Sequence, residues 1–210
     1  RGLGDVYKRQ MCNIILSSRP LTNDEIREHF EENPDGVGFA AYLGGGKWLI
    51  RRALSPEFLR WDDVKSQTWV WHFRLGTQGE RTLENVQPIP LFGAAPGSDA
   101  AEVVVDGFIA HNGHIPGMHD QFYSDTVMLA QLLARVLRND AKVEDISALL
   151  SAIGGGKYVI AKGAFYVRVG EFYKNGDLIM SSIMCLLPKQ YRKPNVLWWT
   201  HTLLRNRGED

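Results

Sequence analysis

The order of the predicted elements is the feature that most constrains this fold. Strand-like segments come first, two helical segments occupy the centre, and strand-like segments return. The first central helix, capped by Ser124, carries an apolar stripe at i, i+3, i+4, i+7 and i+8: Leu129, Leu132, Leu133, Val136 and Leu137. A second helix is predicted over residues 143–152. This order favours an α+β fold in which sheets pack on each other and helices lie outside.

Short apolar segments bounded by turn residues predict the strands. We expect strands at residues 13–16, 37–42, 47–52, 68–74, 102–110, 158–161, 164–169 and 178–182. The triple glycine at 44–46 predicts a hairpin turn between two of them. Helices are predicted from Thr22 to about Glu32 and over residues 56–65. Residues 91–101, rich in Gly, Ala and Pro, predict a surface loop.

Composition narrows the possible partners. The 24 basic and 24 acidic residues balance, so no overall field favours nucleic acid or an anionic membrane, and small molecules are expected instead. The two cysteines, Cys12 and Cys185, have no paired spacing, which fits a reducing cytoplasm. No apolar run approaches the roughly 20 residues that span a bilayer. We place one domain at residues 11–187 and a tail at 188–210.

Cys12 is the candidate nucleophile. Residues 1–10 have neither apolar periodicity nor a targeting pattern, so we interpret them as a non-native scar. Removal of Met11 would then leave a thiol and a free amine on Cys12. The reference pKa is about 7.7 to 8.0 for an α-amine and about 8.5 for a thiol, so the amine can take the thiol proton near neutral pH. The alternative is an ordinary buried cysteine.

Four further segments accompany Met11-Cys12 along the chain. They read NPDGVGFA at residues 33–40, HFRLGTQG at 72–79, HNGHI at 111–115 and SDT at 124–126. In this order and spacing the five motifs resemble those of class II glutamine amidotransferases, from Met11 to about Ser182. The resemblance implies an N-terminal-nucleophile hydrolase fold, an α+β, four-layer αββα sandwich of two antiparallel sheets flanked by helices.

The resemblance implies catalytic roles for three residues. Cys12 matches the family nucleophile, and its own amine would be the base that activates it. Asn112, through its side-chain amide, and Gly113, through its backbone N–H, match the donors that stabilise the oxyanion. Asn112-Gly113 would also suit a plain type I′ turn, which is the alternative explanation of this dipeptide.

Three more residues match substrate-binding positions of the family. Arg74 matches the guanidinium that binds the α-carboxylate of the substrate, and Asp125 the carboxylate that receives its α-ammonium. Thr77 stands where the family places a hydroxyl near the substrate. The alternatives are a surface ion pair for Arg74 and ordinary helix N-terminal chemistry for Asp125.

Three positions depart from the family pattern. Gln78 and Gln87 stand where the family has histidines, and we expect their side chains to lie side by side and to hydrogen-bond through their amides. Asn13 replaces the glycine that usually follows the nucleophile, so it would crowd Cys12. These departures affect the shape of the substrate pocket rather than the nucleophile or the charged residues.

The implied activity is release of ammonia from glutamine through a γ-glutamyl thioester, without a cofactor. No metal is expected, because the spacing of His72, His111, His114 and His119 matches no common zinc pattern. No synthase domain follows, so the ammonia would pass to a separate acceptor subunit or water would complete a glutaminase reaction. Three alternatives stay open: hydrolysis of another γ-glutamyl amide, a catalytically inactive module that binds a glutamine-like ligand, and an interaction protein that uses its aromatic, basic tail.

Overall fold

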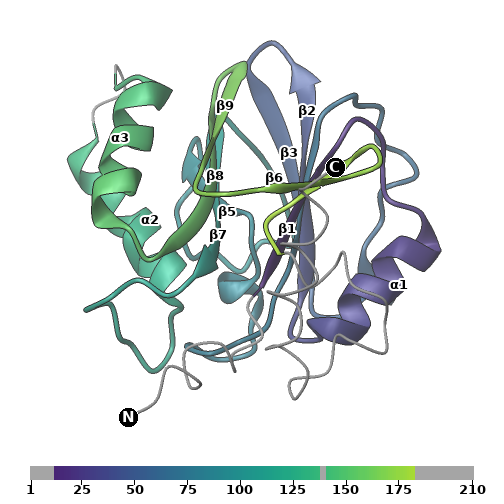
Figure 1. Cartoon of the computed structure of the whole chain (residues 1–210), viewed down its shortest axis with the longest axis horizontal. Helices are drawn as coiled ribbons and strands as arrows, with labels where there is room; N and C mark the ends of the chain where they lie inside the picture. Colours follow the sequence, from purple (N-terminus) through teal and green to yellow (C-terminus); the bar gives the residue numbers. More distant parts are fainter. Residues whose placement is uncertain (1–11, 138–140, 183–210) are drawn as a thin grey trace, which may run out of the picture.

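The computed structural model describes residues 12–137 and 141–182, which form an α+β fold with two antiparallel sheets and three α-helices (Figure 1). The predicted α+β class is therefore confirmed. In chain order the elements are β1 Asn13–Ser17, α1 Asn23–Glu32, β2 Val37–Gly44, β3 Lys47–Ala53, β4 Trp69–Phe73, β5 Ile89–Phe92, β6 Glu102–Val105, β7 Gly107–Gly113, α2 Asp125–Val136, α3 Val143–Ile153, β8 Gly156–Lys162, β9 Phe165–Val169, β10 Tyr173–Asn175 and β11 Leu178–Met180.

The larger sheet has the strand order β10-β11-β1-β4-β2-β3-β6, and the smaller sheet has the order β5-β7-β8-β9. In Figure 1, α1 lies on one side of the strands, and α2 and α3 lie on the other. β1 and β4 are antiparallel neighbours in the larger sheet, with Asn13 opposite Phe73. Cys12 directly precedes β1 and Arg74 directly follows β4, so the two residues lie at the same end of this strand pair.

Three clusters of buried side chains hold these elements together. One joins α1 to the larger sheet through residues such as Ile26, Phe39 and Trp71. A second joins α2 and α3 to the smaller sheet. The third contains residues of both sheets, including Ile14 of β1 and Ala110 of β7. Since burial of apolar surface is the main stabilising contribution to folding, these clusters fix how helices and sheets pack.

The helix starts follow the predicted capping chemistry. The Thr22 hydroxyl accepts the Glu25 N–H while the Glu25 carboxylate accepts the Thr22 N–H, which forms a capping box at α1. The hydroxyl of Ser124 accepts the N–H of Val127 and caps α2. The hairpin between β2 and β3 is also confirmed, and its Gly46 has a φ of 78°.

The structure corrects three predicted elements and adds a strand that was not predicted. The expected strand at 102–110 is two strands, β6 in the larger sheet and β7 in the smaller one. The chain changes sheets at Gly107, where a Cβ would lie 2.3 Å from the carbonyl oxygen of Ala161, so only glycine allows this close approach. The helix expected at 56–65 is a single 3₁₀ turn, Pro56–Phe58. β5 begins before the predicted loop and extends into it, and β10 was not predicted.

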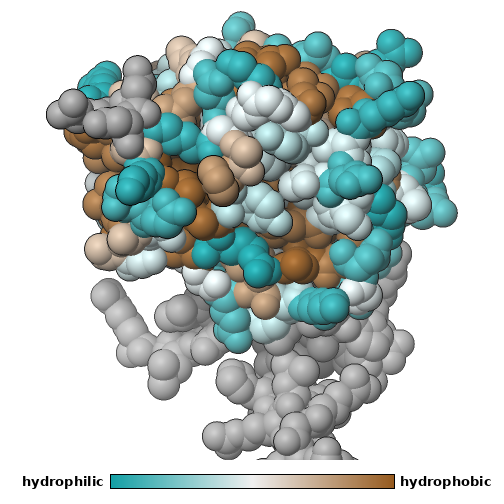
Figure 2. Space-filling model, turned by 90° about the horizontal axis from the view of Figure 1, so that it is seen from above, coloured by the Kyte–Doolittle hydropathy of each residue, from teal (hydrophilic) through white to brown (hydrophobic). Residues whose placement is uncertain are grey.

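The face of the molecule shown in Figure 2 mixes hydrophilic and hydrophobic residues. None of the helices formed by residues 12–137 and 141–182 is long and apolar enough to cross a membrane. The proposed scar at residues 1–10, Cys185 and the tail at 188–210 lie outside the described residues.

Candidate active site around Cys12

Cys12 lies directly before β1 and contacts the residue after Arg74. Its sulfur lies 3.4 Å from the backbone nitrogen of Leu75, which donates to it, and 3.5 Å from the carbonyl oxygen of the same residue. The side chain is half-buried. The antiparallel pairing of β1 with β4 produces this contact, because it places the beginning of β1 beside the end of β4.

A pocket opens beside Cys12 and joins residues from distant parts of the chain. Its cavity volume is only about 20 Å³, so the pocket is narrow. Five of the six residues carried over from the family line it: Cys12, Arg74, Thr77, Gly113 and Asp125.

Arg74 is a buried cation without a carboxylate partner. Its side chain is 3% exposed, and Nη2 donates to the carbonyl oxygens of Gln78 at 2.9 Å and Gly79 at 3.3 Å. Among the described residues, no carboxylate lies within ion-pairing distance of this guanidinium. Burial lowers the pKa of Arg74, although the negative charge of Asp35, and that of Cys12 when it is a thiolate, act in the opposite direction. The predicted alternative, a surface ion pair, is therefore wrong, and the positive charge of Arg74 has no carboxylate partner among the described residues.

Asp125 supplies the opposite charge from the first turn of α2. Its Oδ2 accepts the N–H of Ile115 at 2.8 Å, and its Oδ1 accepts the hydroxyl of Thr126 at 3.3 Å. The rings of His111 and His114 lie 3.8 Å and 3.6 Å from the carboxylate. Burial alone would raise the pKa of Asp125, but His111 and these hydrogen bonds lower it below its ordinary value. The carboxylate is therefore ionised at neutral pH.

The electrostatics of Cys12 oppose ionisation. Burial is the largest effect and raises the pKa of the thiol, and the charge of Asp125 raises it as well. The Leu75 N–H and the charge of Arg74 lower the pKa, but they do not reverse the effect of burial. The thiol is therefore protonated at neutral pH and needs a base to become a nucleophile.

Asn112 is placed differently from the other five predicted residues. Its side chain is 2% exposed, its Nδ2 donates to Oγ of Ser181 at 2.8 Å, and it is not among the residues lining the pocket. Its Oδ1 is buried without a hydrogen-bond partner among the described residues. Asn112 and Gly113 belong to β7 and pair with Lys157 and Gly156 of β8, so the turn proposed as an alternative is wrong.

The expected hydrogen bond between Gln78 and Gln87 is absent from the described residues, so this prediction is wrong. Oε1 of Gln87 accepts the backbone N–H of His111 at 2.6 Å, and its Nε2 donates to the hydroxyl of Thr126 at 3.2 Å. Nε2 of Gln78 lies 2.6 Å from Nδ1 of His119. Each amide therefore has nearer partners than the other glutamine, although both side chains line the pocket.

Buried side chains to which sequence reasoning assigned no role surround the site. The ring of His111 stacks on Tyr158 with centroids 4.5 Å apart, and its Nδ1 lies 3.1 Å from the hydroxyl of Thr126. Ser181 contacts Asn112 although 69 positions separate them. A lone serine at a strand end gives no sequence signal of such a contact. No group of three or more His, Cys, Asp or Glu side chains within residues 12–137 and 141–182 is arranged to hold a metal ion.

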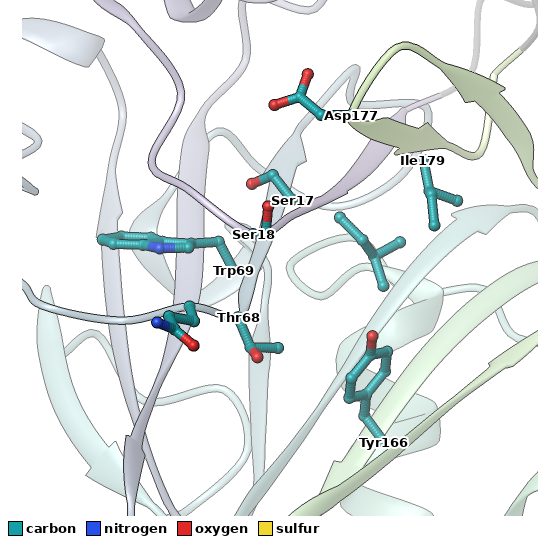
Figure 3. A pocket seen from close by; sticks show the side chains of 9 residues that line it. Ser17, Ser18, Thr68, Trp69, Tyr166, Asp177 and Ile179 are labelled. Atoms are coloured by element: carbon teal, nitrogen blue, oxygen red, sulfur yellow. The ribbon is translucent and has the colours of Figure 1, made fainter.

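A second pocket lies at the opposite ends of β1 and β4 (Figure 3). Its cavity volume is about 210 Å³, and the hydroxyls of Ser17, Ser18, Thr68 and Tyr166 line it. The Asp177 carboxylate at its rim already pairs with Arg19 at 2.7 Å. This pocket holds no cysteine or histidine, so the pocket beside Cys12 is the better candidate for covalent chemistry.

Comparison with known proteins adds no evidence about the function of this site. No model of a known protein family matches the chain, and no curated protein shows significant similarity to it.

Proposed function

We propose that this chain is an amide hydrolase similar to class II glutamine amidotransferases, with Cys12 as its nucleophile. The proposal includes the four-layer αββα sandwich of N-terminal-nucleophile hydrolases. Two antiparallel sheets that share a core, with helices packed on the outer face of each, support that fold.

One observation carries the proposal. Cys12 precedes β1, Arg74 follows β4 and Asp125 begins α2, and they line one pocket together with the backbone of Gly113. The pocket therefore combines a thiol, a cation without a carboxylate partner and an ionised carboxylate. A free amino acid carries the complementary charges on its α-carboxylate and α-ammonium, so glutamine or another γ-glutamyl amide suits the site.

The proposed reaction begins with a chain that has been cut before Cys12. The α-amine of Cys12 takes the thiol proton, and the sulfur attacks the side-chain carbonyl carbon of the substrate. The backbone N–H of Gly113 and the amide of Asn112 stabilise the oxyanion. The carbon–nitrogen bond then breaks, ammonia leaves with the proton, and water hydrolyses the γ-glutamyl thioester to glutamate. The ammonia passes to a separate acceptor subunit or is released, in a reaction that we place in the cytoplasm.

A second candidate is a binding module for a glutamine-like ligand that performs no chemistry. The raised pKa of the Cys12 thiol favours this candidate, because a protonated thiol is a weak nucleophile. The two candidates share the charged groups of Arg74 and Asp125 and differ only in the reactivity of Cys12.

Covalent labelling separates them. A chain that begins at Met11, from which an aminopeptidase can expose Cys12, is treated with a chloroketone analogue of glutamine, and its intact mass is measured. The proposal predicts one adduct on Cys12, slower labelling in Arg74→Gln, and unchanged labelling in Arg81→Gln, whose side chain is exposed. Saturable binding of the analogue without an adduct would favour the binding module.

A further inference from the structure

Ser181 is a buried serine directly after β11, and its side chain is 0% exposed. Its hydroxyl oxygen accepts the backbone N–H of Ile14 at 2.8 Å and the Nδ2 of Asn112 at 2.8 Å. The same hydroxyl donates to Oδ1 of Asn13 at 3.5 Å. One hydroxyl therefore joins the strand that follows Cys12 to the residue proposed for the oxyanion.

The backbone of Ser181 is fixed as well. Its N–H donates to the carbonyl oxygen of Ile14 at 2.9 Å, and its own carbonyl oxygen accepts from Nζ of Lys157 at 2.5 Å. Ile14 belongs to the larger sheet, whereas Lys157 and Asn112 are paired residues of the smaller one. Ser181 thus links the two sheets by hydrogen bonds beside the candidate active site.

The hydrogen-bonding capacity of a hydroxyl sets the orientation of the Asn112 amide. A serine hydroxyl has one proton and two acceptor lone pairs. Asn13 receives the proton, and one lone pair is taken by the N–H of Ile14, so the remaining lone pair requires a donor. Asn112 therefore presents Nδ2 rather than Oδ1 to Ser181, and no residue within 12–137 and 141–182 accepts the second proton of Nδ2, which leaves it available to another acceptor.

We propose that Ser181 is a positioning residue for the amide hydrolysis suggested above, a role that rests on that proposed function. It holds the Asn112 amide with one N–H bound and the other free for the oxyanion, and it fixes β1 two residues beyond Cys12. Ser181 does not touch the substrate. It acts through Asn112 and Ile14.

Removal of the hydroxyl has a specific kinetic consequence. Ser181→Ala frees the amide of Asn112 to rotate, so stabilisation of the transition state is lost while Arg74 and Asp125 still bind the substrate. Loss of an oxyanion donor lowers kcat by about 10² to 10³-fold. A misplaced donor loses part of this effect, so we expect kcat to fall by about 10- to 100-fold with KM within about threefold.

The test compares steady-state ammonia release by chains beginning at Met11. Ser181→Thr keeps the hydroxyl and should retain most of kcat. Ser181→Cys is close to serine in size but forms only weak hydrogen bonds, so its kcat should resemble that of Ser181→Ala. Ser181→Cys therefore replaces Ser181→Ala in the test if Ser181→Ala does not fold. Ser17→Ala removes a buried hydroxyl at the other end of β1, where it donates to the carbonyl oxygen of Arg19, and should leave kcat unchanged.

The outcomes separate this inference from the proposed function. If the unaltered chain is active but Ser181→Ala or Ser181→Cys keeps full kcat, the positioning role alone is overturned. The same holds if these variants change KM rather than kcat. No ammonia release by the unaltered chain from glutamine or any γ-glutamyl amide overturns the proposed function, and the role of Ser181 with it. Hydrogen exchange of the Ile14 N–H gives a readout independent of activity, and it should be faster in Ser181→Ala than in Ser17→Ala.

Discussion

The backbone nitrogen of Leu75 lies 3.4 Å from the sulfur of Cys12 and donates to it. Leu75 follows Arg74 directly, so a backbone dipole and a guanidinium charge both act on the thiol from the end of β4. Both favour the thiolate, while burial and Asp125 disfavour it. The reactivity of Cys12 depends on the balance between these two sets of influences.

This balance predicts the pH dependence of alkylation. In the chain with residues 1–11 attached, the rate of Cys12 alkylation should rise with pH around a midpoint above the ordinary thiol pKa of about 8.5. Arg74→Gln should move the midpoint higher, because the charge that favours the thiolate is lost. Iodoacetamide rates measured by mass spectrometry in a Cys185→Ser background test both statements, and a midpoint below 8.5 would contradict them.

Arg74 should matter for its shape as well as its charge. Arg74→Lys keeps the positive charge but loses the planar group that binds a carboxylate through two hydrogen bonds. We expect kcat/KM for glutamine to fall by about 10- to 100-fold, mainly through KM, since a hydrogen bond to a charged group is worth about 1.5 to 3 kcal/mol. Arg81→Lys at the exposed neighbour is the matched control, and equal kinetics in the two variants would argue against carboxylate binding by Arg74.

Gln87 should contribute to stability through its buried hydrogen bonds. Gln87→Ala leaves the N–H of His111 without its acceptor and removes the hydrogen bond that Nε2 of Gln87 donates to the hydroxyl of Thr126. The free energy of unfolding should fall by about 1 to 3 kcal/mol. Exposed Gln121→Ala should change it by less than about 0.5 kcal/mol. Urea denaturation measures both, and a neutral Gln87→Ala would show that this network does not stabilise the fold.

His72 should make the fold sensitive to acid. Burial lowers its pKa to about 3, against about 6.5 in an unfolded chain, so below pH 6.5 the unfolded state binds a proton that the folded state does not. Its contribution to stability is therefore complete above pH 6.5 and is lost as the pH falls from 6.5 to 3, at up to about 1.4 kcal/mol per pH unit. His72→Gln should reduce this slope, measured by urea denaturation at several pH values, and His119→Gln controls for the loss of one histidine. The same slope in His72→Gln and the unaltered chain would contradict the assignment.

Local sequence signals predicted most elements because local chemistry determines them. The capping residues Thr22 and Ser124 mark the starts of α1 and α2. The apolar stripe predicted for α2 was right only in part, because Leu129 and Leu133 are buried whereas Leu132 and Val136 are exposed. The expected strand at 102–110 failed because periodicity does not reveal that a chain crosses from one sheet to another at Gly107. The fold class was therefore predictable, whereas the path between the sheets was not.

The candidate site, like the fold, was predictable from the sequence only in part. Cys12, Arg74 and Asp125 were identified from motifs, and the structure brings them to one pocket. The partners of Gln87 and the contact between Ser181 and Asn112 were not predictable, because tertiary packing selects them from residues far away in the sequence. Short motifs name the reactive groups, and long-range packing determines how those groups are held.

The α-amine of Cys12 is the proposed base of the reaction. With residues 1–11 attached, the nitrogen of Cys12 is an amide, which cannot act as a base at neutral pH. Ammonia release from glutamine should therefore be at least about 100-fold slower in the extended chain than in one whose first residue is Cys12, since a positioned general base contributes about 10² to 10⁴ to the rate. Cys12→Ala should abolish the activity of the trimmed chain. Equal turnover by the extended and trimmed chains would show that the free α-amine is not the base, and the proposed mechanism would be wrong.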